Sequence, residues 1–129
     1  MWPKTTTNYS PNFSLPKRAK LHIKFIILHY TGMKKESLAI KKLCDITSKV
    51  STHYFIKKNG KILTMVPDLY VAWHAGKSKW KHFNNLNKYS IGIEMQNKGH
   101  RINYQNFTKK QIFSLIQLIK KLLKKYKIK

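Results

Sequence analysis

The sequence has 129 residues, the length of one domain, and 42% of them are hydrophobic, enough for one modest core. No apolar run approaches the ~18 residues that a membrane span needs. The segment Met1–Thr7 lacks the hydrophobic stretch of a secretory signal peptide. Because Cys44 is the only cysteine, the sequence excludes an internal disulfide and a cysteine-based zinc ribbon. We expect one domain without a membrane span, cytoplasmic by default, whose localisation is otherwise unknown.

Charge dominates the composition: lysine and arginine number 27 and the acids 4, so the formal net charge is +23. Such a surplus favours an anionic partner such as nucleic acid, anionic lipid or an acidic polymer. Arginine, whose bidentate fork reads bases and phosphates, occurs only as Arg18 and Arg101. A compositional bias toward Lys, Ile and Asn would give the same excess without any binding role, so charge alone leaves both interpretations open.

The first part of the chain predicts an arm, a strand and a helix. Residues 1–20 are polar and rich in proline, which predicts an extended arm before the fold. The run Phe25–Tyr30 is apolar on both faces, which is typical of a buried central strand. Apolar residues then recur at roughly helical spacing over residues 34–46.

The middle of the chain predicts a hairpin followed by a loop. Residues 52–58 and 61–66 are prone to form strands, and Asn59-Gly60 between them is a strong hairpin signal. Residues 67–89 show no period of 2 or 3.6, which predicts a long loop. Long structured loops in compact domains usually carry function.

The last part predicts a strand over residues 90–96 and one long helix over 108–127. The strand alternates, with apolar residues on one face and Glu94 on the other. The helix starts with a capping box, Thr108 with Gln111, and continues with a full apolar stripe. The order of elements predicts an α/β domain with a mixed sheet flanked by helices.

Three polar side chains stand out as candidates for chemistry. His29 ends an apolar strand and shares a face with Phe25 and Ile27, so its imidazole needs a partner or a metal ion. His74 follows Trp73 in the predicted loop, a common lining for a sugar or peptide groove. Glu94 is a carboxylate on an apolar strand, where a raised pKa would suit a general base; a structural salt bridge to a lysine is the alternative.

Several segments together resemble the zinc-dependent N-acetylmuramoyl-L-alanine amidases, the family of the AmpD and AmiD amidases, phage lysozyme-like amidases and peptidoglycan recognition proteins. The likeness runs from about residue 10 to the end. The segments that carry it are Ser10–Phe13, Ile27–Thr31, Ser51–Ile56, Ala72–Gly76 and Asn87–Glu94.

The resemblance implies a mixed sheet flanked by helices, a zinc ion on the sheet, and peptidoglycan or muropeptides as partners. It implies that His29 is the first zinc ligand and that Glu94 is the general base. It places His74 and Trp73 in the substrate groove. The implied reaction is hydrolysis of the amide between N-acetylmuramic acid and the L-alanine of the stem peptide.

The sequence departs from the family at its end. Family members continue past the last helix with a strand and a loop that bring two further zinc ligands, whereas this sequence stops at Lys129. We therefore expect an arm over residues 1–20 and an incomplete amidase domain over 21–129, inactive alone unless a complementing C-terminal fragment supplies the ligands. The alternative is a non-catalytic basic module that binds peptidoglycan or another polyanion such as nucleic acid.

Overall fold

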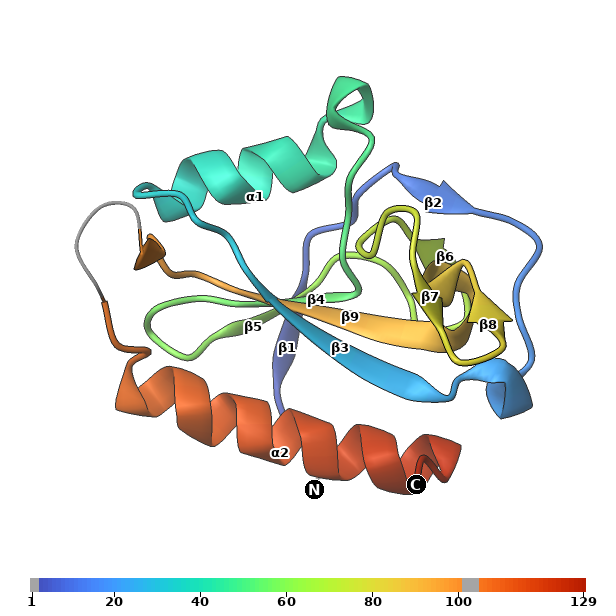
Figure 1. Cartoon of the computed structure of the whole chain (residues 1–129). Helices are drawn as coiled ribbons and strands as arrows, with labels where there is room; N and C mark the ends of the chain where they lie inside the picture. Colours follow the sequence, from blue (N-terminus) through green and yellow to red (C-terminus); the bar gives the residue numbers. More distant parts are fainter. Residues whose placement is uncertain (1–2, 101–104) are drawn as a thin grey trace.

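The computed structural model describes residues 3–100 and 105–129, which form a central sheet between two helices (Figure 1). The strand order in the sheet is β1-β5-β4-β9-β3. Strands β4 and β5 are antiparallel, and the other neighbours are parallel, so the predicted mixed sheet is confirmed. The strands of this sheet are β1 (Thr5–Thr7), β3 (Phe25–Tyr30), β4 (Tyr54–Ile56), β5 (Ile62–Thr64) and β9 (Ser90–Met95).

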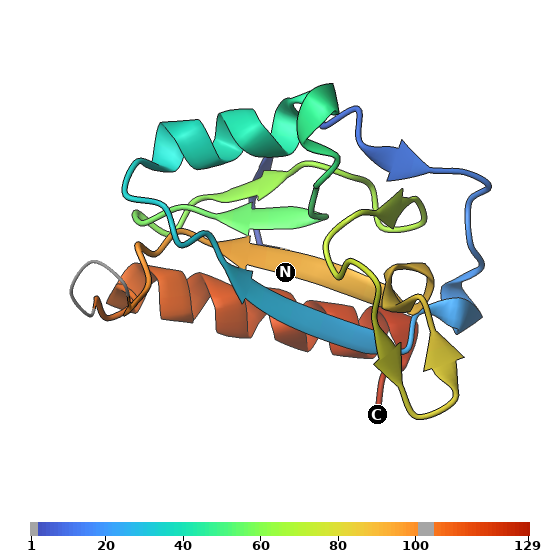
Figure 2. The same cartoon turned by 45° about the horizontal axis from the view of Figure 1, so that its top comes forward.

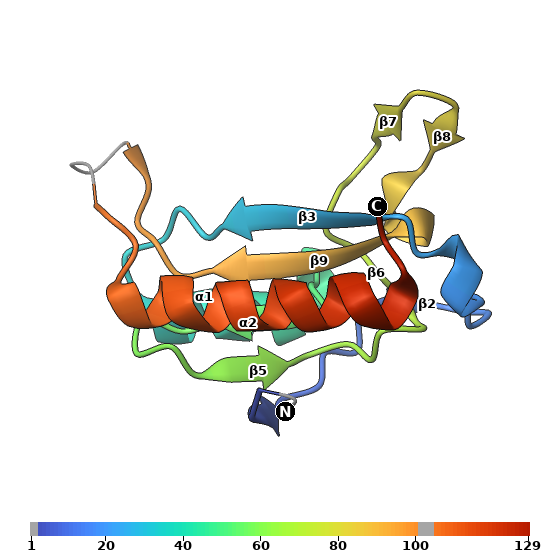
Figure 3. The same ribbon diagram turned by 90° about the horizontal axis from the view of Figure 1, so that it is seen from below.

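Helix α2 (Lys109–Tyr126) covers one face of the sheet and carries the main apolar core (Figure 3). It starts at Thr108 with the predicted capping box, which is confirmed. Leu118 and Leu122 on its buried stripe are fully enclosed and belong to one cluster with Ile91 and Ile93 of β9. No helix in the described part of the chain is long and apolar enough to cross a membrane.

Helix α1 (Glu36–Cys44) covers only part of the opposite face (Figure 1). Its Ala39 and Leu43 pack in a second cluster with Phe55 of β4. The helix is shorter than the predicted 34–46, because the Asp45 side chain accepts a hydrogen bond from the backbone of Thr47 and caps a separate 3-10 turn. Figure 2 shows the segment that carries β6, β7 and β8 beside the other end of the sheet.

The N-terminal segment is extended, as predicted, but it does not precede the fold. Strand β1 pairs in parallel with β5 and forms one edge of the sheet. Ser10 and Asn12 are buried: Oγ of Ser10 donates to the carbonyl of Leu43, and Nδ2 of Asn12 donates to the carbonyl of Val50. These polar side chains of the N-terminal segment are therefore buried because they donate hydrogen bonds to backbone carbonyls of α1 and of the segment after it.

Two further predictions need correction. Strand β3 lies at the edge of the sheet among the described residues, not at its centre, and its Leu28 and Tyr30 are each 49% exposed. The segment 67–89, predicted as a loop, has regular structure of its own. It contains the short strands β6 (Val71–Ala72), β7 (Lys79–Trp80) and β8 (Phe83–Asn84), with β6 paired to β2 (Phe13–Ser14). The remaining short elements are the 3-10 turns η1 (Lys20–His22), η2 (Ile46–Ser48) and η3 (Leu86–Tyr89).

Candidate active site

Parallel pairing of β3 with β9 brings two predicted site residues together. The register places His29 directly beside Glu94. Because side chains alternate along a strand, Ser90, Gly92 and Glu94 lie on the face of β9 opposite to the apolar core under α2. The chain thus builds a polar face and an apolar face from one six-residue strand.

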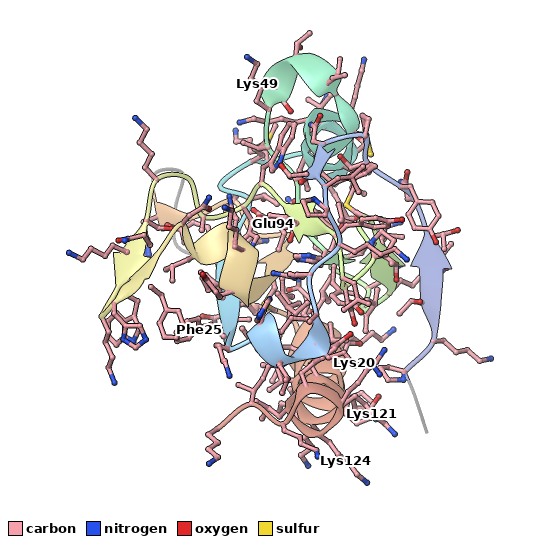
Figure 4. The ribbon with its side chains drawn as sticks, turned by 90° about the vertical axis from the view of Figure 1, so that its right-hand side faces the viewer. Lys20, Phe25, Lys49, Glu94, Lys121 and Lys124 are labelled. Carbon is pink, nitrogen blue, oxygen red and sulfur yellow. The ribbon has the colours of Figure 1, made fainter. Side chains whose placement is uncertain are left out.

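A cavity of about 220 Å³ lies over this polar face, beside α1. His29, Trp73, His74 and Glu94 all line it, together with Lys42 of α1. The four residues predicted for the site therefore share one cavity. Figure 4 shows Glu94 near the middle of the molecule, whereas Lys49, Lys121 and Lys124 lie at its periphery.

Glu94 is the acid of this cavity. Burial raises the pKa of its carboxyl to about 7, and the positive charge of Lys42 partly opposes that rise. Within residues 3–100 and 105–129 no hydrogen bond or close ion pair is found for this carboxylate, and its described electrostatic neighbour is Lys42. A carboxyl group that titrates near neutrality can both take and return a proton.

His29 contacts His74 through a single ring nitrogen. Its Nε2 lies 3.0 Å from Nδ1 of His74, and the two rings meet edge to face. Burial lowers the pKa of His29, so the ring is neutral at neutral pH. Its Nδ1 has no hydrogen-bond partner in the described part of the chain.

His74 uses both ring nitrogens within the protein. Nδ1 faces His29, and Nε2 lies 3.0 Å from Oγ of Ser90. Burial lowers the pKa of His74, and the neighbouring His53 and His29 lower it further. Neither nitrogen is free for a substrate, so the predicted contribution of His74 to substrate binding stays a prediction, although the ring does line the cavity.

The segment around Trp73 and His74 is held in place by side chains that the sequence analysis did not single out. Oδ1 of Asn87 accepts hydrogen bonds from the backbone of His74 and Ala75, at 3.2 and 2.8 Å. The indole N–H of Trp73 donates to Oγ of Ser14 at 2.7 Å. A lone asparagine in a polar segment carries no signal that distinguishes such an anchor from a solvated side chain.

His53 and Arg18 are the largest omission of the sequence analysis. His53 is completely buried, and its Nδ1 accepts a hydrogen bond from the backbone N–H of Gly92 at 3.0 Å. The proton of the neutral ring is then on Nε2, which lies 2.8 Å from the carbonyl of Tyr70 and 3.1 Å from Nη2 of Arg18. Burial and the nearby Arg18 lower the pKa of His53 to about 3. Its place on an apolar strand was the available signal, because a buried imidazole needs partners.

A complete zinc site does not fit the described residues. A catalytic zinc ion needs three protein ligands. No group of three or more His, Cys, Asp or Glu that could hold a metal ion is found in residues 3–100 and 105–129. His29 offers one free nitrogen and Glu94 one carboxylate beside it.

The structure thus combines a mixed sheet between two helices with a cavity in which a buried acid lies beside a histidine. The family model of N-acetylmuramoyl-L-alanine amidase matches residues 19–129. The chain therefore belongs to the N-acetylmuramoyl-L-alanine amidase family.

Relatives agree with this assignment. The chain is 38% identical over 120 residues to the N-acetylmuramoyl-L-alanine amidase AmiD of Escherichia coli, covering 83% of this chain and 42% of AmiD. The structure of AmiD in complex with anhydro-N-acetylmuramic acid-L-Ala-D-gamma-Glu-L-Lys is similar, with a TM-score of 0.74 and 34% identity over 90% of this chain and 49% of that one. AmpDh3 of Pseudomonas aeruginosa, in complex with anhydromuramic pentapeptide, has a TM-score of 0.75 and 31% identity over 82% and 47%. The chain thus spans less than half the length of these relatives.

Proposed function

We propose that this site hydrolyses the amide between N-acetylmuramic acid and L-alanine in muropeptides. Support comes from the family and from the muropeptides bound to two similar structures. The observation that carries the proposal is the carboxyl group of Glu94, unpaired among the described residues and with a pKa near 7, in a cavity that Trp73 and His29 also line.

Amide hydrolysis needs one proton to travel from water to the leaving nitrogen. The water oxygen bonds to the carbonyl carbon, and the C–N bond then breaks. Glu94 takes the proton that the water loses and returns it to the departing amine, which a group with a pKa near neutrality does in both directions. Trp73 offers an aromatic surface at the cavity wall for the stem peptide or the sugar.

The hydrolysis assay uses N-acetylmuramoyl-L-alanyl-D-glutamate with excess zinc, and it compares the chain alone with a chain extended at its C-terminus by the corresponding segment of an AmiD-type relative. We expect the chain alone to release little or no peptide, because the described residues supply too few zinc ligands. The extended chain should release the peptide, and Glu94→Gln in the extended chain should be slower by ~10²–10⁴-fold, because the amide cannot accept the proton. Glu36→Gln is the matched control, since Glu36 lies on α1 away from the cavity lining. Equal rates for the extended chain with Glu94 and with Glu94→Gln would show that Glu94 is not the base.

His29 would be one ligand of a zinc ion in this site. A bound ion would polarise the amide carbonyl. The described residues do not complete its coordination, so the proton transfers above are assigned to Glu94 alone. We expect the dialysed chain to hold well under one zinc ion per chain. Elemental analysis after dialysis measures this. One tightly held zinc ion that is lost in His29→Ala would contradict it.

A non-catalytic binding role is the second candidate, and the net charge of +23 favours it. It predicts that the chain binds peptidoglycan or a polyanion but releases no peptide in the hydrolysis assay. Measuring binding at several salt concentrations distinguishes binding of a polyanion by surface lysines from binding of a muropeptide in the cavity. Binding through surface lysines weakens steeply with ionic strength, whereas binding in the cavity does not. The predicted complementing fragment has no support in the comparisons.

A further inference from the structure

The cavity over the polar face of the sheet has one lysine in its described lining. Apart from Lys42 and Glu94, the residues of that lining are histidines or uncharged side chains. Within the described residues, no hydrogen bond or close ion pair is found for the ammonium group of Lys42. We propose that Lys42 is a specificity-determining residue that binds the free carboxylate of the second stem-peptide residue of a muropeptide.

The position of Lys42 on α1 directs its side chain to the cavity. Successive residues of an α-helix are about 100° apart, so Lys42 lies about 60° from Ala39, which is buried and also lines the cavity. Lys41 lies about 160° from Ala39, on the outer side of the helix. The carbonyl of Lys42 accepts hydrogen bonds from the N–H of Asp45 at 3.2 Å and from Oγ of Ser48 at 2.6 Å. The backbone is therefore held at the end of α1, while the ammonium group stays available.

The size of the cavity limits which part of a muropeptide it holds. Its volume of about 220 Å³ is smaller than the ~300–1,000 Å³ of pockets that enclose a drug-sized ligand. This inference rests on the proposed function, which puts the scissile amide beside His29 and Glu94. The cavity then has room for the first residues of the stem peptide. Because an extended chain advances about 3.5 Å per residue, the second stem residue lies within about 7 Å of the scissile amide.

The second stem residue carries a carboxylate at that distance. In the ligand bound to AmiD, which contains L-Ala-D-gamma-Glu-L-Lys, the γ-linkage leaves the α-carboxylate of D-Glu free. A carboxylate that enters the cavity meets the like charge of Glu94, and Lys42 supplies the opposite charge. An ammonium group donates hydrogen bonds, and those that it donates to a carboxylate are stronger than those to a neutral acceptor. A carboxamide in the same place would therefore gain less from Lys42.

The experiment measures binding to the full chain by isothermal titration calorimetry without added zinc. One probe is N-acetylmuramoyl-L-Ala-D-γ-Glu-L-Lys, and the other is the same compound with a carboxamide in place of the α-carboxylate of D-Glu. We expect the wild-type chain to bind the carboxylate probe about twofold to fivefold more tightly, the range for an ion pair that solvent partly screens.

Three variants test whether this preference comes from Lys42. Lys42→Met removes the charge but keeps an unbranched, helix-forming side chain, and it should reduce the preference to about one. Lys42→Arg keeps the charge and should keep the preference. Lys41→Met is the matched control, because it removes the same charge from the outer side of the same helix, and it should leave the preference unchanged. A damaged fold would weaken the binding of both probes alike, so the ratio of the two affinities separates a specific role from a structural one.

Two results would overturn the proposal. One is a wild-type chain that binds both probes equally or binds neither. The other is a Lys42→Met variant that keeps the wild-type preference. The wild-type comparison needs no variant, so the proposal can be refuted even if a substitution unfolds the chain. An extended chain that fails in the hydrolysis assay, while the preference for the carboxylate persists and depends on Lys42, would contradict the proposed function and leave this inference standing.

Discussion

The two faces of the central sheet differ in polarity: the face under α2 is apolar, and the other face is polar. Under α2, the odd positions of β9 bury Ile91, Ile93 and Met95 in an apolar cluster. On the other face, the even positions Ser90 and Glu94 meet a network of histidines and a cavity. The first face stabilises the fold through burial, whereas the second carries desolvated polar groups that hydrogen bonds must offset. One strand thus supplies both stability and chemistry.

The largest expected effect tests the apolar face. Leu118→Ala should lower the free energy of unfolding by about 2–5 kcal/mol, because Leu118 is 0% exposed and its truncation leaves a cavity. Leu123→Ala, on the same helix and 37% exposed, should cost far less. Urea unfolding of both variants measures this. Equal losses would show that α2 does not pack on the sheet as described.

A substitution on the polar face of β9 should have a smaller effect with a different cause. Gly92→Ala places a methyl group against the His74 ring, and displacing a packed ring costs about 1–3 kcal/mol. The same substitution in a His74→Ala background should cost much less, because the ring is gone. Urea unfolding of the four proteins forms a double-mutant cycle. Additive losses would mean that Gly92 and His74 do not meet.

The smallest expected effect is the change with pH in the free energy of unfolding that the titration of Glu94 causes. The pKa of Glu94 is raised from 4.5 to about 7 in the folded chain, so the folded state binds this proton more tightly than the unfolded state. Its contribution to stability therefore falls as pH rises through that window. Glu94→Gln should gain on the order of 2 kcal/mol relative to wild type between about pH 5 and 8.

Urea unfolding at several pH values gives this difference directly. The histidines contribute the opposite slope: their lowered pKa values mean that stability is lost as pH falls below about 6.5. They contribute equally to wild type and Glu94→Gln, so subtraction isolates Glu94. A difference that does not change with pH would contradict the raised pKa.

Features decided by neighbours in the chain could be predicted from the sequence. The alternation of β9, the capping box at Thr108 and the hairpin at Asn59-Gly60 each depend on contacts within a few residues. The four candidate site residues followed from strand ends and from the resemblance, and they do share one cavity. Local chemistry is enough for such features because the partners are already adjacent.

Only the tertiary structure decided how those residues are held. The contacts of His29 with His74 and of Arg18 with His53 join residues 45 and 35 positions apart. The edge position of β3 and the inclusion of β1 in the sheet likewise depend on pairing between distant strands. An apolar run shows that a strand can be buried but not what lies beside it. By itself, the sequence determined which side chains are available for chemistry; the packing of distant segments determined which partners the ring nitrogens of His29, His53 and His74 have.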